Sequence, residues 1–472
     1  MNDKAESLLD LKTLLESVSG TCLSKNTCDI FFSSVATDSR VVGKNTLFVP
    51  LVGEKQNGHS FIGSALNKGA SVIFVEQSEY NSKKSEYDSL SEKSTATFII
   101  TENNLHALQS IAAAYVKKFS GLIKVGVTGS SGKTTTKELL VALLSQKYSV
   151  IANEGNLNSE TGLPLSVFKI REEHAIGVFE MGMNRVGEIQ ELANVLCPQF
   201  AVITNIGTAH IGILGSRQNI ASEKKKIFSK FSGKETAFIP CNDDFCDFLS
   251  KNVNGSVVKY GADDDVVHFI SDLGLDGTRF SVNGVSMTLP LPGNYNFRNA
   301  CAAIKVALAL GVSPEQIKNG IESIKPIFGR SQVLRGKYTI IQDCYNANPD
   351  SMEKSIEFCA SLKSQKRKIL VLGDMLELGS DSETEHSKIG VFASSENFSL
   401  IIFVGDEMHY AFESAKKSAP NKNVMYFSGK SDETIESVAS VIEKNAIAGD
   451  LILLKASRGI GLERLTKKLS GC

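Results

Sequence analysis

The chain of 472 residues lacks the sequence features of membrane-spanning proteins, of basic nucleic-acid-binding proteins and of zinc-binding or disulfide-rich proteins. No apolar run approaches the roughly 20 residues that a helix needs to span a bilayer. The net charge of −1 leaves no basic surplus, which argues against a broad electrostatic surface for nucleic acid. The nine cysteines occur without CxxC or CxH spacing, which argues against a zinc site or a disulfide framework.

The remaining composition is that of a folded protein, with 42% hydrophobic and 22% charged residues. Because the chain is too long for one ordinary core, two or three domains are expected. The first residues, MNDKAESLLDLKTLL, are acidic and amphipathic, unlike a secretory signal peptide. These features predict a cytoplasmic protein that does not insert into a membrane.

Apolar runs divide the chain into three parts, each of α/β type. Residues 1–104 alternate short apolar runs with glycine-rich turns, which predicts a small α/β domain. Residues 105–328 hold the strongest phosphate and metal signals and predict a central domain of the P-loop ATPase type with a parallel sheet. Residues 329–472 alternate strand and helix patterns, which predicts βαβ units and a Rossmann-like, mostly parallel sheet.

The clearest motif is GVTGSSGKTTTKELL at 126–140, where a strand pattern meets a glycine-rich turn and then a helix pattern. Backbone N–H groups in such a loop favour the negative charge of a phosphate. Lys133 would reach the outer phosphates, and the Thr134 hydroxyl would bind Mg²⁺. Val127 stands where the strict P-loop pattern has its first glycine, so the loop is a shorter variant that begins at Gly129. It predicts a nucleoside triphosphate but not the reaction.

Two later residues are candidate partners of this loop. Glu180 ends the apolar run in AIGVFEMGM, and His210 lies in a glycine-containing loop after another apolar run. A carboxylate and an imidazole at strand ends could join Thr134 around Mg²⁺, although imidazole is a less usual ligand of that ion. Each residue alone is more often structural, and the phosphate loop strengthens the functional interpretation of both.

Three successive lysines occur in the helical pattern RQNIASEKKKIFSKF. Lys224 lies four residues after Ile220 and three before Ile227, so it shares their apolar stripe, whereas Lys225 and Lys226 are rotated away from it. A lysine on an inward face snorkels, pairs with an anion or is chemically altered. Burial also lowers the pKa of an amine, which leaves more of the reactive neutral form.

These motifs resemble the Mur ligases of peptidoglycan synthesis over nearly the whole chain. The matching segments include TDSR at 37–40, the phosphate loop, GNLNSETGLPLS at 155–166, FEMGMNRVGEI at 179–189, GNYNFRNACAA at 293–303, DCYNANPDSM at 343–352 and LGDMLELG at 372–379. The last two resemble the member of the family that adds D-alanyl-D-alanine. The resemblance implies an ATP-dependent, Mg²⁺-requiring ligase that adds this dipeptide to UDP-N-acetylmuramoyl-tripeptide through an acyl phosphate. It also favours a monomer.

The resemblance further implies roles for individual residues. The four catalytic residues would be Lys133, Glu180, Lys224 and His210, and the last three would hold metal together with Thr134, Lys224 as a carbamate. The residues that bind ATP would be Gly129, Ser130, Ser131, Gly132, Lys133, Thr134, Thr135, Asn296, Asn299, Arg330 and Asp343. The residues that bind the uridine nucleotide, the peptide and the dipeptide would be Ser39, Arg40, Asn156, Asn158, Tyr345, Asn346 and Asn348.

Three positions depart from the family pattern and leave details open. Tyr295 stands where a histidine is usual, Lys226 where a glutamate is usual, and Gln342 replaces a frequent acidic residue. Two other functions also stay open, namely a ligase for another peptide or for folate polyglutamates, and a regulator that binds ATP without turnover. The TDSR segment favours a uridine nucleotide over a folate. No motif distinguishes lysine from diaminopimelate as the third residue of the acceptor peptide.

Overall fold

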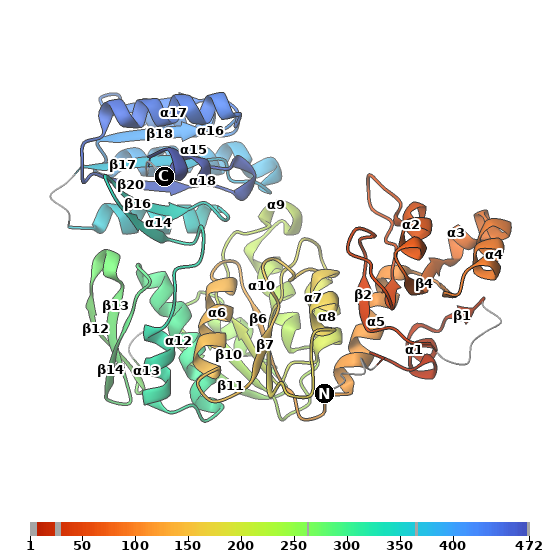
Figure 1. Ribbon diagram of the computed structural model, residues 1–472. Coiled ribbons are helices and arrows are strands. Elements are labelled where there is room, and N and C mark those ends of the chain that lie inside the picture. The colour runs from red at the N-terminus through yellow and green to blue at the C-terminus, as the bar shows by residue number, and fades with distance from the viewer. Residues whose placement is uncertain (1–6, 24–29, 262–263, 364–366, 470–472) are drawn as a thin grey trace.

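The computed structural model describes residues 7–23, 30–261, 264–363 and 367–469. Figure 1 shows three lobes, with the first (red to orange) and the last (blue) set apart from each other and both attached to the central lobe. Each lobe is built on its own sheet with helices packed against it. The predicted fold class, three α/β domains with mostly parallel sheets, is therefore confirmed.

The first lobe has a sheet of order β1-β5-β4-β3-β2, parallel except for the β1–β5 pair. Its strands are β1 (Thr21–Cys22), β2 (Ser34–Ala36), β3 (Thr46–Phe48), β4 (Ala70–Glu76) and β5 (Thr97–Thr101). Its helices are α1 (Leu11–Val18), α2 (Ile62–Asn67), α3 (Gln77–Ser82) and α4 (Lys84–Lys93). Strands β4 and β5 are almost wholly apolar because helices or loops cover both of their faces.

The central lobe has a parallel sheet of order β11-β10-β9-β6-β8-β7. Its strands are β6 (Ile123–Thr128), β7 (Val150–Ala152), β8 (Ile176–Glu180), β9 (Phe200–Ile203), β10 (Thr236–Pro240) and β11 (Ser256–Tyr260). A separate, small antiparallel sheet follows, with strands β12 (Val267–Asp272), β13 (Thr278–Val282) and β14 (Val285–Leu289). Its helices are α6 (Lys133–Leu144), α7 (Gly162–Val167), α8 (Glu188–Leu196), α9 (Ile211–Leu214), α10 (Arg217–Lys225), α11 (Cys246–Ser250), α12 (Asn294–Ala309) and α13 (Pro314–Glu322). This strand order makes β8 and β9 the two neighbours of β6, so the carboxyl ends of these three strands meet at one edge.

The last lobe has a sheet of order β15-β16-β20-β17-β18-β19, in which only β15 is antiparallel. Its strands are β15 (Gln332–Arg335), β16 (Thr339–Asp343), β17 (Lys368–Gly373), β18 (Leu400–Val404), β19 (Val424–Phe427) and β20 (Leu451–Lys455). Two separate cores cover its two faces, one with α14 (Pro349–Ser361), α15 (Ser382–Ser395) and α16 (Met408–Ser418), the other with α17 (Asp432–Asn445) and α18 (Glu463–Leu469). This is the doubly wound arrangement that the alternating pattern predicts.

Helix α5 (Asn104–Lys117) joins the first lobe to the central one. It packs against α1 of the first lobe and against α7 and α8 of the central lobe, so one continuous core runs through both. The predicted domain boundaries after residues 104 and 328 stay predictions. Within the described residues, no helix combines the length and the apolar character needed to cross a membrane.

We predict that Gly390→Ala destabilises the last lobe. Gly390 lies where α15 packs on α16, and a Cβ there would stand 2.0 Å from the carbonyl oxygen of Ala411. Overpacking of this kind costs about 1–3 kcal/mol and sometimes more. The urea midpoint should fall, whereas Gly63→Ala, a helical position with no atom within 4 Å of the new Cβ, should leave it unchanged or slightly raised. Equal midpoints for the two variants would contradict this packing.

Candidate active site

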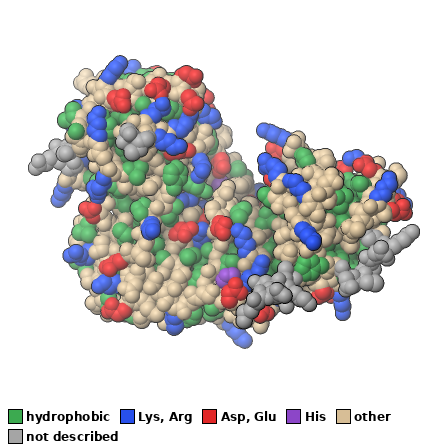
Figure 2. Space-filling model, viewed as in Figure 1, with side chains coloured by type: hydrophobic (Ala, Val, Ile, Leu, Met, Phe, Trp, Pro, Cys, Tyr) green, Lys and Arg blue, Asp and Glu red, His purple; other side chains and the backbone are tan. Residues whose placement is uncertain are grey.

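A cavity of about 920 Å³ lies between the central and last lobes. The phosphate loop, the ends of β8 and β9, the start of α12 and the β16–α14 connection all contribute to its lining. Figure 2 shows that the surface is also notched between the last lobe and the first. A cavity of this size at the carboxyl ends of parallel strands suits a ligand as large as a nucleotide.

Two glycines give the phosphate loop its shape. Gly129 has φ +151° and Gly132 has φ +79°, both in the region that favours glycine. A Cβ on Gly129 would lie 1.8 Å from Thr204 Oγ1, and one on Gly132 would lie 2.4 Å from Asn299 Oδ1. Neighbouring segments therefore approach the loop so closely that any side chain at these two positions would collide with them.

The segment after β9 holds the loop from the side. Asn205 Oδ1 accepts from the Ser131 N–H at 3.1 Å, and Asn205 Nδ2 donates to the Ser131 carbonyl oxygen at 2.9 Å. The Ser130 hydroxyl accepts from the Gly207 N–H at 2.8 Å. Lys133 Nζ donates to the Gly129 carbonyl oxygen at 3.0 Å, so its charge lies over the loop, and burial lowers the pKa of this lysine.

The Thr134 hydroxyl joins three segments of the chain. It donates to Glu180 Oε2 at 2.7 Å and accepts from Arg330 Nη2 at 2.8 Å. The other carboxylate oxygen of Glu180 accepts from Asn158 Nδ2 at 2.7 Å. The Arg330 guanidinium lies over the ring of Tyr345, 4.0 Å from its centroid. Five of the predicted site residues thus meet in one group.

His210 meets a carboxylate that the sequence did not single out. Its Nδ1 lies 3.0 Å from Glu377 Oε2, an ion-pair contact without the alignment of a hydrogen bond. Both residues have left-handed backbones, with φ of +64° and +68°, an arrangement that is uncommon outside glycine and often marks functional sites. Contact with His210 lowers the pKa of Glu377. Glu377 falls in the segment LGDMLELG, where helical or strand spacing gives no signal.

Lys224 is almost completely buried, with 1% of its surface exposed, and is not among the residues that line the cavity. Burial, followed by the nearby charge of Lys133, lowers its pKa well below the ordinary value. Among the described residues, none forms a hydrogen bond or ion pair with its Nζ. Lys225 instead donates to the Phe248 carbonyl oxygen at 2.7 Å, and Lys226 to Glu223 Oε2 at 2.6 Å. The inward face assigned from spacing agrees with this burial.

Three family profiles match successive parts of the chain. They are described as the catalytic domain of the Mur ligase family over residues 32–116, the Mur ligase middle domain over 127–307, and the Mur ligase glutamate ligase domain over 329–458. The chain belongs to the Mur ligase family.

Individual Mur ligases are similar to this one over nearly its full length. A UDP-N-acetylmuramoyl-tripeptide–D-alanyl-D-alanine ligase of Treponema pallidum is 42% identical over 92% of this chain and 93% of its own. The enzyme of the same name from Bacillus subtilis is 34% identical over 97% and 98%. Among solved structures, MurF from Acinetobacter baumannii superposes with a TM-score of 0.86, 27% identity and 98% coverage of both chains. MurF from Thermotoga maritima in complex with ADP gives a TM-score of 0.76 and 28% identity over 93% and 97%.

The oxygen atoms beside the phosphate loop fit a magnesium ion. Mg²⁺ is usually held by one or two carboxylates together with waters and substrate phosphates. The Thr134 hydroxyl and the Glu180 carboxylate offer such oxygens, while His210 would be a less usual ligand. In the part of the chain that the structure describes, no three His, Cys, Asp or Glu side chains are grouped to hold a metal unaided, so phosphate and water would complete the shell.

The residues assigned to the adenosine side lie around the start of α12 and β16. Asn296 and Asn299 are buried cavity-lining residues, and Asn296 Nδ2 donates to the Pro292 carbonyl oxygen at 2.8 Å. The Tyr295 hydroxyl forms a hydrogen bond of 2.7 Å with that of Ser331. Tyr295 also meets the ring of Phe358 edge-on. The position where the family usually has histidine is thus an aromatic wall of the cavity with its own hydroxyl partner.

The last lobe adds two contacts that spacing did not reveal. Lys455, buried at the end of β20, forms an ion pair of 2.9 Å with Asp343, whose side chain is 13% exposed. Asp350, at the start of α14, accepts from the backbone N–H and the hydroxyl of Thr208 at 2.5 and 2.6 Å. The second contact docks the last lobe on the central one. Both depend on how segments far apart in sequence meet.

The remaining predicted residues divide into two groups. Those that line the cavity are Ser130, Ser131, Thr135, Asn156, Asn346 and Asn348. Ser39 and Arg40 lie in the first lobe, away from the cavity, where Arg40 pairs with Asp38 at 2.6 Å. This arrangement therefore does not bring them to the phosphate loop.

We predict that Lys455→Met destabilises this Mur ligase by about 3 kcal/mol, because it leaves the largely buried carboxylate of Asp343 without its cationic partner and, among the described residues, with only two hydrogen-bond donors, the Ser331 N–H and the Ser355 hydroxyl. The double variant with Asp343→Asn should regain at least half of the loss, since it removes that charge. Urea unfolding of the two variants and the parent measures both effects. A loss below about 1 kcal/mol in the single variant would contradict the buried pair.

Proposed function

We propose that this Mur ligase adds D-alanyl-D-alanine to UDP-N-acetylmuramoyl-tripeptide at the expense of ATP, in the synthesis of peptidoglycan precursors. The single observation that carries the proposal is the group formed by Thr134, Glu180 and Arg330, beside Lys133, inside a cavity between two lobes. The names of relatives similar over nearly the full chain support the choice of substrates.

The chemistry follows from what each group can do. A carboxylate is a poor electrophile, so the acceptor carboxylate takes the γ-phosphoryl group of ATP, giving an acyl phosphate and ADP. The neutral amine of the dipeptide then attacks the acyl carbon, forms the C–N bond of the amide and loses a proton, and phosphate leaves with the electron pair of the broken C–O bond. Lys133 and Arg330 neutralise charge on the transferring group, and fixed positions supply much of the remaining acceleration. Mg²⁺ held by Thr134, Glu180 and His210 would add further charge neutralisation when bound.

The lobes divide the substrates between them in this proposal. Ser39 and Arg40 of the first lobe hold the uridine-nucleotide end of the acceptor, while its peptide end extends to Asn156 and Asn158 at the cavity. Tyr345, Asn346 and Asn348 of the last lobe lie close to ATP and help to hold the dipeptide. Asn296, Asn299, Arg330 and Asp343 contact the nucleoside and phosphates of ATP. We expect the enzyme to act in the cytoplasm, as a monomer.

Lys224 is proposed to carry a carbamate. Its neutral amine would add to carbon dioxide and release a proton, which creates an anion in a region where Lys133 already lies close. The lowered pKa favours this reaction because it supplies the neutral amine. The new anion would then help to bind a second Mg²⁺.

Phosphate release from ATP tests the function directly. With Mg²⁺, the UDP-tripeptide and D-alanyl-D-alanine present, we expect release that requires both organic substrates, and a product with the mass of the UDP-pentapeptide. Omitting either substrate should abolish release. Turnover with single amino acids would instead indicate a sibling activity, and ATP binding without any turnover would indicate a regulator.

The carbamate predicts a chemical rescue. Lys224→Ala should lose roughly 10²-fold or more in kcat, as expected when a charge-stabilising group is removed. Short carboxylic acids such as acetate should restore part of the rate by supplying the missing anion. Lys225→Ala is the matched control and should stay active, since among the described residues its Nζ contacts only two backbone carbonyl oxygens and a ring face, all outside the cavity. Equal losses at both positions would remove the reason for choosing Lys224.

A further inference from the structure

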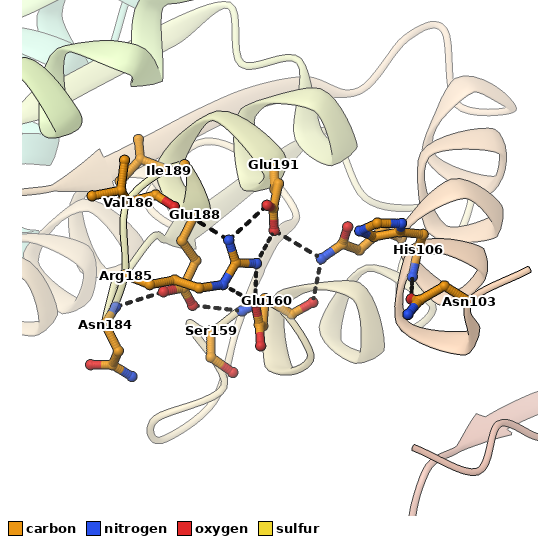
Figure 3. A network of polar contacts seen from close by, with 12 residues as sticks. Asn103, His106, Ser159, Glu160, Asn184, Arg185, Val186, Glu188, Ile189 and Glu191 are labelled. Atoms are coloured by element: carbon orange, nitrogen blue, oxygen red, sulfur yellow. Dashed lines mark hydrogen bonds and ion pairs between the residues drawn. The ribbon is translucent and has the colours of Figure 1, made fainter. Parts of the chain in front are cut away.

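Two segments lie on either side of Glu180 and contribute to the cavity, residues 153–161 after β7 and residues 181–187 after β8. Figure 3 shows that polar contacts centred on Arg185 join them to each other and to α5. No function assigned above uses Arg185. One of its partners, Glu160, nevertheless lies two residues from Asn158, which donates a hydrogen bond to Glu180.

Arg185 binds two carboxylates at once. Its Nε donates to Glu160 Oε2 at 2.9 Å, and its Nη2 contacts the same oxygen. Its Nη1 and Nη2 donate to the two oxygens of Glu191 at 2.9 and 2.5 Å. A planar guanidinium can meet both carboxylates with several donors in fixed directions, which a lysine ammonium cannot do.

Glu188 joins the same two segments from the buried side. With 2% of its surface exposed, it accepts from the Glu160 N–H at 3.1 Å and from the Asn184 N–H at 2.6 Å. The backbone at Glu160 is thus held by Glu188, and its side chain by Arg185. The side chain of Arg185 and the carboxylate of Glu188 thus both connect the two segments (Figure 3).

The same segment, residues 153–161, includes Asn158, a direct hydrogen-bond partner of Glu180. Asn158, two residues before Glu160, donates to Glu180 Oε1 at 2.7 Å, and its carbonyl oxygen accepts from the Gly182 N–H at 2.8 Å. A Cβ on Gly182 would lie 3.1 Å from the Asn158 amide carbon, so the two segments are also in close contact there. A shift of residues 153–161 would therefore move a hydrogen-bond donor away from the carboxylate.

Helix α5 is tied to the same group. Gln109, 8% exposed, donates to the Glu160 carbonyl oxygen at 3.2 Å and lies 3.5 Å from Glu191 Oε2. Because α5 also packs against α1, movement of the first lobe would reach Glu160 through this buried amide. An isolated exposed ion pair contributes little. Here one guanidinium is shared by two carboxylates, and a buried amide contacts the same two glutamates, so the contacts form a connected network.

We propose that Arg185 is a positioning residue: by holding Glu160 and Glu191 together it fixes Asn158 against Glu180 and ties this part of the site to helix α5. The inference rests on the proposed function only where turnover is measured. Partners that orient a metal-binding carboxylate typically change affinity or activity by 10- to 100-fold when removed. Arg185 acts on Glu180 only through Glu160 and Asn158, so we expect its loss to change Mg²⁺ affinity or activity by about tenfold, the lower end of that range.

The first experiment compares Arg185→Lys with Arg464→Lys. Arg464 is a matched control because it pairs with Asp432 in the last lobe, far from the cavity, and its side chain is 33% exposed against 43% for Arg185. Without substrates, hydrogen–deuterium exchange of residues 153–161 and 181–187 should accelerate in Arg185→Lys only. In turnover assays, the half-saturating Mg²⁺ concentration should rise about tenfold in Arg185→Lys and stay unchanged in the control. Unchanged exchange and unchanged Mg²⁺ dependence in Arg185→Lys would overturn the proposal.

A double-variant cycle separates positioning from general stability. If Arg185 acts through Asn158, then Arg185→Lys should have little further effect on the Mg²⁺ dependence once Asn158→Ala is present. Full additivity of the two substitutions would overturn the proposed route. Gln109→Leu keeps the buried volume and should accelerate exchange of residues 153–161, and unchanged exchange there would remove α5 from the account. Failure of the parent enzyme to turn over would count against the proposed function, while the exchange data would still test the network.

Discussion

The hydroxyl of Thr134 connects three segments that line the cavity, because it donates a hydrogen bond to Glu180 and accepts one from Arg330. A triphosphate and its Mg²⁺ ion need positive side chains for the phosphates and oxygen atoms for the metal, all at one place. Here the strand order provides the convergence, because β6 and β8 are neighbours and their carboxyl ends deliver the phosphate loop and Glu180 to the same point. Arg330 then reaches the same hydroxyl from the segment that enters the last lobe. One small side chain thus links the phosphate loop, a carboxylate and the segment that enters the last lobe.

Two lysines lie near this point, Lys133 at the cavity and the buried Lys224 behind it. Burial lowers the pKa of both Lys133 and Lys224, and the charge of Lys133 lowers the pKa of Lys224 further. A positive charge on Lys133 disfavours protonation of the buried Lys224, whereas an added negative group nearby stabilises the charge of Lys133. Phosphates of ATP and a carbamate on Lys224 would both do so. Glu377, which the last lobe delivers to His210, lies close enough to Lys133 for the charge of that lysine to lower its pKa as well.

The parts of this account that follow from local spacing could be predicted from the sequence. Alternating strand and helix patterns gave the α/β class, the glycine spacing gave the phosphate loop, and the position of Lys224 between Ile220 and Ile227 gave its inward face. Contacts between distant segments could not be predicted in this way. The pairing of Asp350 with Thr208 and the network of Arg185 depend on how separate loops and lobes meet, and no periodicity encodes that.

In the proposed reaction, the acceptor carboxylate is activated by phosphate before the amine attacks. Acceptor labelled with ¹⁸O in its terminal carboxylate tests this claim most directly, with mass spectrometry of the inorganic phosphate released during turnover. Each phosphate should carry one ¹⁸O atom, because the bridging oxygen of the acyl phosphate leaves with the phosphorus. Phosphate free of ¹⁸O, with the departing label found in AMP or in water instead, would contradict activation by phosphate.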